Sequence, residues 1–324
     1  MDSAEFIRQE VAAGCPAHCH GGVWWKTTAR GACRPLLPFH EIVPGTARPA
    51  WRKSWIGYSH LVPASHPTPR RARYWIMEES ALRAYSLKSV SYSLRKPVNR
   101  AVRHGLTVAR LEDLAPWWDD LRAIAISKAE RTGYGQSAEF YRVRFDRWQR
   151  EIAQEFAKPN REWWGVFKGN RLGAYLYGYQ IDGTMYLQVA KVHSDFLAEY
   201  ASYLLYVSVL EYCRDLPGCR RVNAGALTEA AGVNEFQQKQ GFQLAESGEY
   251  TAYNPAVRLL LKAVKKLPPP REPAGSASAG GKPSRVAALH RHALRMAARL
   301  ELQGNGPDGD GEPRRAERLA GEEE

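Results

Sequence analysis

The segment 162–253 constrains the fold most, because strand-like and helix-like stretches follow one another there with almost no irregular sequence between them. Its first three apolar runs are separated by short turns at Gly169 and Gly183, and such turns between β-rich runs are typical of hairpins. The later stretches are assigned by their hydrophobic period and their flanking residues. The expected elements are three strands within 162–192, a helix at 197–213, a strand at 221–224, a helix at 230–240 and a strand at 242–253.

The rest of the chain adds a second set of strands and further helices. Extended apolar or aromatic runs bounded by Gly, Pro or charge fill 22–77, as strands should. Helical signals precede the meander at 80–87, 114–131 and 139–156. We therefore expect an α+β (mixed α/β) fold.

With 324 residues the chain is long enough for two domains with separate cores. We expect a basic N-terminal domain at 1–110 and a second domain at 111–267. Residues 268–324 are rich in Pro, Gly and Ala, which predicts a disordered tail. Within that tail, 284–303 has the period of a short basic helix.

Positive charge is concentrated near the N-terminus. The net charge is +12, and residues 1–110 hold 17 Lys+Arg against 6 Asp+Glu. A one-sided basic field attracts polyanions such as RNA, anionic lipid or phosphorylated sugar nucleotides, although it also serves solubility alone. Composition leaves both interpretations open.

The five cysteines predict neither disulfides nor a metal site. The chain begins without the regions of a secretory signal, and no apolar run reaches the roughly 20 residues that span a bilayer. We therefore expect a cytoplasmic protein with reduced thiols and no transmembrane segment. The Cys and His residues within 15–40 lack paired Cys-x2-Cys hooks, which favours a loop with incidental thiols over a bound metal.

Three stretches share features with known enzymes. LRKPVNRAVRHGLTV (94–108) is a basic helix that ends in Gly before a strand, 172–213 is a meander followed by a long helix, and EFQQKQGF (235–242) ends a helix with Gly and an aromatic. These stretches resemble the GNAT acyltransferase superfamily and, more narrowly, the Fem family of peptidoglycan-bridge aminoacyltransferases and related bacterial acetyltransferase-domain proteins. The resemblance covers about 22–266 and implies two GNAT-like halves, the first reduced and the second complete.

The resemblance also implies where an acyl donor would bind. In GNAT-like folds the donor lies where two neighbouring parallel strands separate, and here that place falls between 185–192 and 221–224. Backbone groups of the middle strand would then bond the acyl chain. The expected donor contacts are the backbones of Gln188, Val189, Ala190 and Asn223.

Acyl transfer to an amine needs a donor carbonyl polarised by N–H groups and an amine that has lost its proton. Asp195 and Glu199 are the carboxylates nearest the end of the middle strand, and they are the candidates for the base. An acidic side chain there also stabilises a helix N-terminus, so capping is the competing interpretation for each.

Two departures from the family patterns affect the donor. GNAT enzymes that use acetyl-CoA usually place a Gly-rich loop after the middle strand, and VHSDFLAEYAS (192–202) has no glycine. A Fem-type Phe-Lys pair appears here as Phe236-Gln237, where Gln hydrogen-bonds but supplies no charge. Gln237 is therefore a catalytic candidate whose identity predicts altered or lost activity. The expected donor substrate is acyl-CoA or aminoacyl-tRNA, with no tightly bound cofactor.

Cations of the basic region are the candidates for binding phosphate, because Arg and Lys are the residues that bind it. Their expected partner is an anionic substrate, namely a sugar nucleotide, a lipid phosphate or a tRNA, and they also permit peripheral membrane contact. The candidates are Arg52, Lys53, Arg95, Lys96, Arg100 and Arg103.

The sequence thus predicts an N-acyltransferase that moves an acyl or aminoacyl group from an activated donor to an amine. The alternative is a non-catalytic GNAT-fold protein that uses its basic half to hold RNA or a lipid phosphate. Gln237 is the feature that most favours this alternative.

Overall fold

The computed structural model describes residues 1–28, 31–68, 70–133 and 136–259. The predicted tail at 268–324, with its helix at 284–303, lies outside these residues. Among the described residues, the chain divides into a larger unit, Met1–Cys15 with Arg71–Ser247, and a smaller unit, Pro16–Arg70 with 248–259. The division does not follow the predicted boundary at residue 110, because 71–110 pairs and packs with the larger unit.

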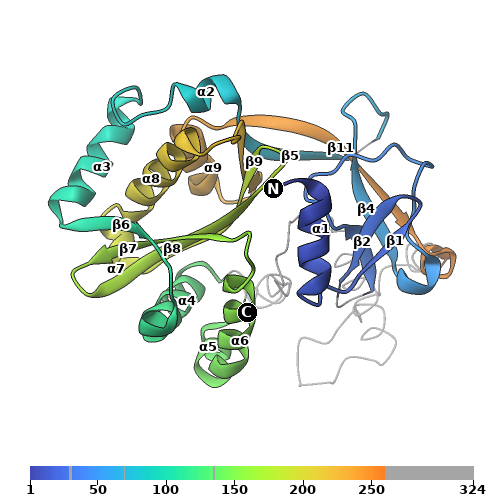
Figure 1. The fold of residues 1–324 in the computed structure, drawn as a ribbon, viewed down its shortest axis with the longest axis horizontal. Coiled ribbons are helices and arrows are strands. Elements are labelled where there is room, and N and C mark those ends of the chain that lie inside the picture. Colours follow the sequence, from blue (N-terminus) through green and yellow to red (C-terminus); the bar gives the residue numbers. More distant parts are fainter. Residues whose placement is uncertain (29–30, 69, 134–135, 260–324) are drawn as a thin grey trace, which may run out of the picture. The chain divides into compact units, whose positions relative to one another are not determined.

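The larger unit contains the whole of the meander and the helices that follow it, α7, α8 and α9 (Figure 1). Its elements are α1 (Ser3–Ala12), β5 (Arg71–Met77), α2 (Glu79–Arg83), α3 (Tyr92–Arg103), β6 (Leu106–Arg110), η2 (Ala115–Trp117), α4 (Trp118–Thr132), α5 (Ala138–Val143), α6 (Phe145–Phe156), β7 (Glu162–Lys168), β8 (Arg171–Ile181), β9 (Thr184–Val192), α7 (Ser194–Ala198), α8 (Ala201–Asp215), β10 (Arg221–Ala226), α9 (Ala231–Lys239) and the start of β11 (Gln243–Tyr253).

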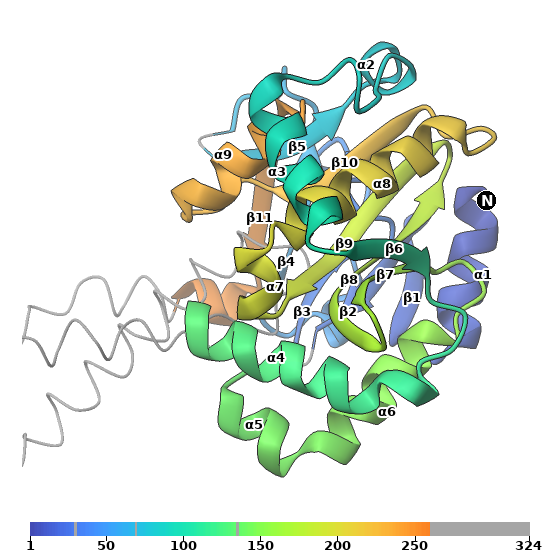
Figure 2. The same ribbon diagram turned by 90° about the vertical axis from the view of Figure 1, so that its left-hand side faces the viewer.

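The strands of this unit lie in the order β11-β5-β10-β9-β8-β7-β6. β6 to β9 are antiparallel neighbours, whereas β10 runs parallel to β9 after the crossover through α8. Helices cover both faces: α2, α3 and α8 pack on one, and α4, α5 and α6 on the other (Figures 1 and 2). The predicted mixed α/β class is therefore confirmed.

Two apolar clusters hold these layers together. The face under α8 carries aliphatic residues with Trp164 and Phe196, whereas the face under α4–α6 is largely aromatic, with Trp148, Trp163 and Tyr175 at its centre. Side chains of β8 alternate between the two clusters, as the period of a strand requires. The two faces of one sheet thus differ in chemistry.

Turn residues explain the hairpins. Asp182 and Gly183 both have positive φ, 48° and 80°, as a two-residue turn of type I′ requires. The predicted strands within 162–192 are confirmed as β7, β8 and β9. The predicted helices at 139–156 and 197–213 are each interrupted. Arg144 separates α5 from α6, and Tyr200, in a left-handed conformation at φ 67°, separates α7 from α8.

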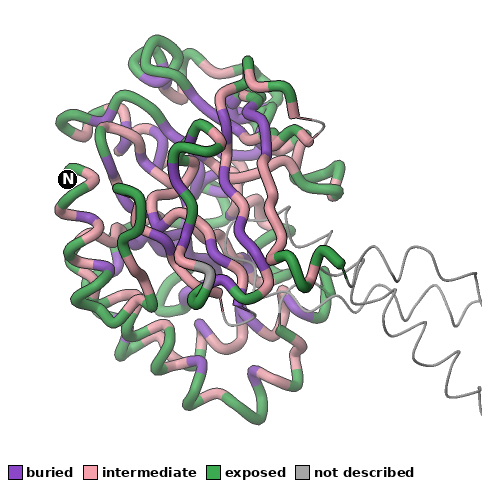
Figure 3. Tube along the Cα trace, turned by 90° about the vertical axis from the view of Figure 1, so that its right-hand side faces the viewer, coloured by how far each residue is buried: buried purple, intermediate pink, exposed green. Residues whose placement is uncertain are grey.

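The smaller unit is a sheet of short strands, in the order β1-β2-β3-β4-β11. Its core packs Trp25 and Tyr58 with Cys33 and Ile42. Figure 3 shows buried stretches along its strands and exposed connections between them. The elements are β1 (Ala17–His20), β2 (Val23–Thr27), β3 (Ala32–Pro35), η1 (Trp51–Lys53), β4 (Gly57–Val62) and the end of β11. In the described part of the chain, no helix has the length and apolar character needed to cross a membrane.

Candidate functional site

β9 and β10 pair over only three residues. The register runs Thr184–Arg221, Met185–Val222 and Tyr186–Asn223, and then the pairing stops although β9 continues to Val192. The pairing of β10 with its other neighbour, β5, is also interrupted after Asn223. It resumes at Ala226, which lies opposite Tyr74. The edge of β9 from 187 to 192 therefore has no strand partner on that side among the described residues.

Gly225 contributes to the early end of the β9–β10 pairing. Its φ is +91°, and its N–H donates to the Asn223 side-chain oxygen at 2.8 Å. A positive φ of this size suits glycine, because it carries no Cβ. The Asn223 side chain is consequently engaged in shaping β10 and is 2% exposed.

A bulge lies at the start of the unpaired half of β9. Tyr177 faces Val189 and Gly178 faces Leu187, so Gln188 is an extra residue in the ladder. The Gln188 amide donates to the Tyr179 hydroxyl at 2.8 Å. Gly178 lies so close to β9 that an added Cβ would meet the Tyr186 carbonyl oxygen at 2.5 Å, so this position requires glycine.

The bulge reverses which face each side chain of β9 occupies. Before it, Met185 and Leu187 pack in the cluster under α8, and after it Ala190 and Val192 do so. Because side chains alternate along a strand and the bulge adds one residue, Val189 and Lys191 point to the aromatic face under α4–α6. A lysine is thereby brought into an aromatic layer.

Lys191 lies against two rings of that layer. Its Nζ lies 5.2 Å from the ring centre of Tyr141, 5.5 Å from that of Trp148, and 3.5 Å from the Tyr141 hydroxyl oxygen. Burial, with a smaller contribution from the nearby Lys128, lowers the pKa of Lys191 to about 7. The sequence analysis missed this residue. The available signal was a lysine inside the otherwise apolar run of β9.

The turn after β9 is occupied by the protein's own groups. The Ser127 hydroxyl accepts the Ser194 N–H at 2.9 Å, and His193 Nδ1 accepts the Asp195 N–H at 3.3 Å. Arg131 donates to the Val192 carbonyl at 3.3 Å. In the expected Gly-rich loop of a CoA enzyme these N–H groups would face a pyrophosphate. Here α4 supplies part of their hydrogen bonding.

The two carboxylates predicted as bases are in ion pairs. Glu199 contacts Lys168 at 2.5 Å, and Asp195 lies 3.7 Å from Arg171. Lys168 and Arg171 flank the β7–β8 turn, whereas β10 lies on the opposite side of β9 in the strand order. The structure therefore does not bring Asp195 and Glu199 to the unpaired edge of β9. Their catalytic role stays a prediction.

Gln237 is 4% exposed and packs between α9 and α8. Its amide lies 3.3 Å from the Tyr206 hydroxyl, and its carbonyl oxygen has no hydrogen-bond partner within the described residues. A buried amide with one open acceptor supports the packing of two helices but presents little surface to a substrate.

The six predicted phosphate-binding cations divide between the units. Arg52 and Lys53 are exposed on η1 of the smaller unit. The other four lie on α3 of the larger unit, where Arg100 donates to the Tyr200 hydroxyl at 2.9 Å. The four are Arg95, Lys96, Arg100 and Arg103.

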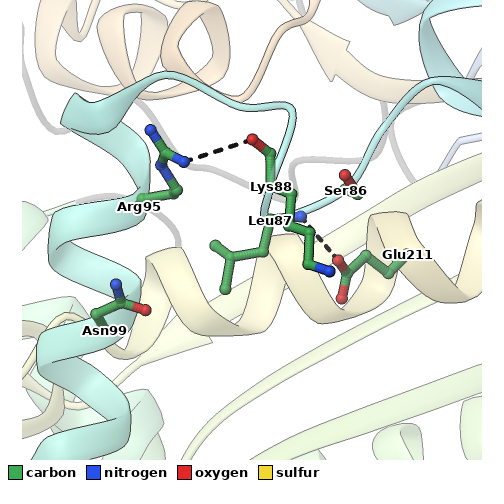
Figure 4. Close-up of a pocket in the computed structure, with 6 residues that line it drawn as sticks. All are labelled: Ser86, Leu87, Lys88, Arg95, Asn99 and Glu211. Carbon is green, nitrogen blue, oxygen red and sulfur yellow. Dashed lines mark hydrogen bonds between the residues drawn. The ribbon is translucent and has the colours of Figure 1, made fainter.

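An open cavity of about 480 Å³ lies beside α3 (Figure 4). Arg95 and Asn99 line it from α3, and Glu211 lines it from α8, where its carboxylate accepts the Leu87 N–H at 2.9 Å. Arg95 reaches the Lys88 carbonyl at 3.5 Å. The cavity holds both signs of charge and lies on α3 and α8, not on β9.

Comparisons with known proteins support the fold. No protein-family model and no curated protein sequence matches the chain. A solved structure that resembles it is the C-terminal domain (DUF2156) of a protein described as a lysylphosphatidylglycerol synthetase, from Agrobacterium fabrum. Its TM-score is 0.51, with 12% identity over 81% of this chain and 96% of that chain. The chain therefore shares the fold of that domain.

Two further structures score below 0.5. FemX has a TM-score of 0.44 and 13% identity, over 62% of this chain and 65% of that one. A tandem GNAT protein from the clavulanic acid biosynthesis pathway has a TM-score of 0.44 and 12% identity, over 71% and 78% of the two chains. At these identities the comparisons concern the fold alone.

Proposed function

We propose that the larger unit is an N-acyltransferase, which moves an acyl or aminoacyl group from an activated donor to an amine. The observation that carries this proposal is the early end of the β9–β10 pairing, followed by the bulge at Gln188. Together they leave backbone groups of Gln188 to Ala190 on an edge without a strand partner among the described residues.

The chemistry of the reaction explains why such an edge is useful. The amine attacks the donor carbonyl carbon, and negative charge develops on the carbonyl oxygen in the transition state. Fixed backbone N–H groups stabilise that charge without reorganising, so they lower the barrier. The donor's leaving group then departs with a proton as the amide forms.

The donor is proposed to be an aminoacyl ester rather than a CoA thioester. The turn at 192–195 supports this choice, because Ser127 and His193 already accept two of its N–H groups. A pyrophosphate would have to displace both hydrogen bonds.

A thermal-shift experiment tests both statements on the full chain. Acetyl-CoA and an aminoacyl-tRNA mixture are compared with their deacylated forms, CoA and uncharged tRNA. We expect a higher Tm with aminoacyl-tRNA than with uncharged tRNA, because a ligand that binds only the native state stabilises it by mass action. A shift with acetyl-CoA but not with CoA would instead assign the thioester as donor.

A matched pair of variants locates the binding. Gln188→Ala removes the hydrogen bond to Tyr179 that fixes the bulge. Gln180→Ala makes the same substitution in β8, at a position that pairs regularly with β9 outside the bulge. We expect the donor-dependent shift to fall by more than half in the first variant and to persist in the second. Equal shifts in both variants would place the donor away from the bulge.

A second candidate function is binding without catalysis. The observation in its favour is that residues 81–111 contain no Asp or Glu but include the four cations of α3. An acid-free basic segment attracts polyanions. Equal Tm shifts with charged and uncharged tRNA, together with no loss of the aminoacyl ester on incubation with amines, would support binding and contradict transfer.

A further inference from the structure

Lys191 occupies an unusual place for a lysine, on the unpaired half of β9 and three residues beyond the bulge. A strand advances about 3.3 Å per residue, so Lys191 lies roughly 10 Å along β9 from Gln188. It is partly buried, and its Nζ contacts the Tyr141 hydroxyl and faces the rings of Tyr141 and Trp148. Lys191 therefore belongs to the same unpaired part of β9 where the donor is proposed to bind, and its amine lies on the aromatic face of the sheet.

The charged groups around Lys191 do not neutralise it. From α4 it faces Lys128, whose own pKa is lowered by burial and by Arg131. The carboxylate nearest the cluster is Glu151 of α6, which acts on Tyr141 and pairs with Arg147 at 2.9 Å. Among the described residues, neither Lys128 nor Lys191 has a carboxylate in an ion pair.

The tyrosines around Lys191 supply an independent observation. Tyr175 of β8 is directly opposite Lys191 in the register, is 0% exposed, and has a hydroxyl without a hydrogen-bond partner among the described residues. Tyr177 and Tyr141 lie near enough to Tyr175 to act on its ionisation, and burial raises the pKa of Tyr141 and Tyr175. The phenols of Tyr141 and Tyr175 therefore stay protonated at neutral pH.

An orphaned hydroxyl of this kind normally costs free energy, and such groups call for an explanation. Tyr141 offers Lys191 a partner in either protonation state, because its hydroxyl, 3.5 Å from Nζ, can accept from the ammonium or donate to the neutral amine. Tyr175 lies opposite Lys191 in the register, and its unsatisfied hydroxyl adds a second polar group to this layer.

We propose that Lys191 is the general base of the transfer, taking the proton from the ammonium of the acceptor before attack, with Lys128 as the positioning residue that keeps Lys191 ready to accept it. This inference rests on the proposed function and adds the group that performs its proton transfer.

The lone pair of Lys191 Nζ takes one proton from the acceptor's ammonium, which leaves a neutral amine. That amine forms a C–N bond with the donor carbonyl carbon, and the bond from that carbon to the leaving oxygen breaks. The proton released from the new amide nitrogen goes to the leaving oxygen, and Lys191 returns its proton to solvent.

Chemical labelling tests the titration of Lys191 without any substrate. The full chain is treated with pulses of acetic anhydride from pH 5 to 11, and the modification of each lysine is followed by mass spectrometry. We expect the reactivity of Lys191 to rise with a midpoint near pH 7, and Lys239, an exposed lysine on α9, serves as the internal reference. A Lys191 midpoint above pH 9 would overturn the inference whatever the protein's activity.

Two variants connect this titration with transfer. Lys128→Met removes the neighbouring like charge, so we expect the Lys191 midpoint and the acidic limb of the kcat/KM profile to move up together, by about 0.5–1.5 pH units. Lys239→Met removes an equal charge elsewhere and should move neither. A labelling midpoint that moves while the kcat/KM profile stays fixed would remove Lys191 from the proton transfer.

Lys191→Met tests the base itself, with a side chain of similar length. We expect kcat/KM to fall about 10²–10⁴-fold while the donor-dependent Tm shift persists. A fall of less than threefold would overturn the role. If labelling gives a midpoint near 7 but no donor supports transfer, the proposed function fails and the base role fails with it. A failure of the inference alone appears instead as transfer that does not depend on Lys191.

Discussion

Arg161 is a buried cation and Lys191 a partly buried cation of the larger unit, and their surroundings differ completely. The Arg161 side chain is 4% exposed, and its guanidinium bonds Glu155 and, at 2.7 Å, Glu10. Burial lowers the pKa of Arg161, but Glu155 and Glu10 outweigh burial and raise it. Lys191 has aromatic rings and another lysine where Arg161 has carboxylates.

The difference separates a structural cation from a chemical one. Arg161 also lies 4.2 Å from the ring centre of Tyr179, on which Phe6 of α1 stacks, so its contacts fasten α1 to the meander. A cation that is always charged and fully paired suits that purpose. Lys191 makes no comparable set of ion pairs among the described residues. A charge left without a counter-ion in a partly buried site costs stability, and such sites are where catalytic groups are often found.

The largest expected effect is on the structural cation. Arg161→Met leaves Glu10 and Glu155 with only Lys158, whose Nζ lies 3.0 and 2.7 Å from them. Removing one member of a buried ion network typically costs about 3–5 kcal/mol, because the remaining charges stay buried and underpaired. Urea denaturation at pH 7 measures this loss. The matched control is Arg147→Met, which breaks the exposed pair with Glu151 and should cost less than about 1 kcal/mol.

Substitution of Lys191 should have the opposite effect on the free energy of unfolding. The pKa of Lys191 is lowered from 10.5 to about 7, so between those values the unfolded chain binds more protons than the native state. Stability of the wild-type protein therefore rises with pH across this window. At pH 7 Lys191 therefore destabilises the native protein, and Lys191→Met should increase the free energy of unfolding by about 2 kcal/mol. This value is smaller than the full pKa shift would give, because the side chain is partly exposed.

The pH dependence distinguishes this destabilisation from simple packing. The advantage of Lys191→Met should shrink as the pH rises from 7 towards 10, because giving up the proton that the unfolded chain keeps costs less free energy as the pH approaches 10.5. Urea denaturation at pH 7, 8.5 and 10 gives the comparison. If Lys191→Met is less stable than the wild type at pH 7, or if its extra stability does not change with pH, the native structure does not disfavour the charged form of Lys191.

The comparison between these cations was not available from the sequence. The strands, the turns and the order of the meander were predicted, because alternation and turn residues are local signals. The bulge at Gln188 is not local, since it depends on how β8 and β9 align across Gly178. Regular alternation from Met185 would have placed Lys191 on the aliphatic face under α8, where an unpaired ammonium is implausible.

The same limitation applies to the helices after β9. A continuous apolar period favoured one helix at 197–213, but Tyr200 takes a left-handed conformation and ends α7 after five residues. Likewise, the position of Gln237 in a helix was predictable, whereas its burial against Tyr206 depends on how α9 packs on α8. Long-range packing decided each of these features.

The smallest expected effect concerns Glu199, whose carboxylate pairs with Lys168 and is 27% exposed. A carboxylate held by an exposed lysine contributes little to stability, so Glu199→Gln should change the free energy of unfolding by less than about 1 kcal/mol. If Lys191 takes the proton, the same variant should change kcat less than about threefold, and Asp195→Asn should behave alike. The measurement is steady-state transfer with whichever donor gives the Tm shift. If kcat falls 10²-fold or more in either variant, that carboxylate is the general base. Lys191 would then be a destabilising residue of the aromatic layer without a catalytic role.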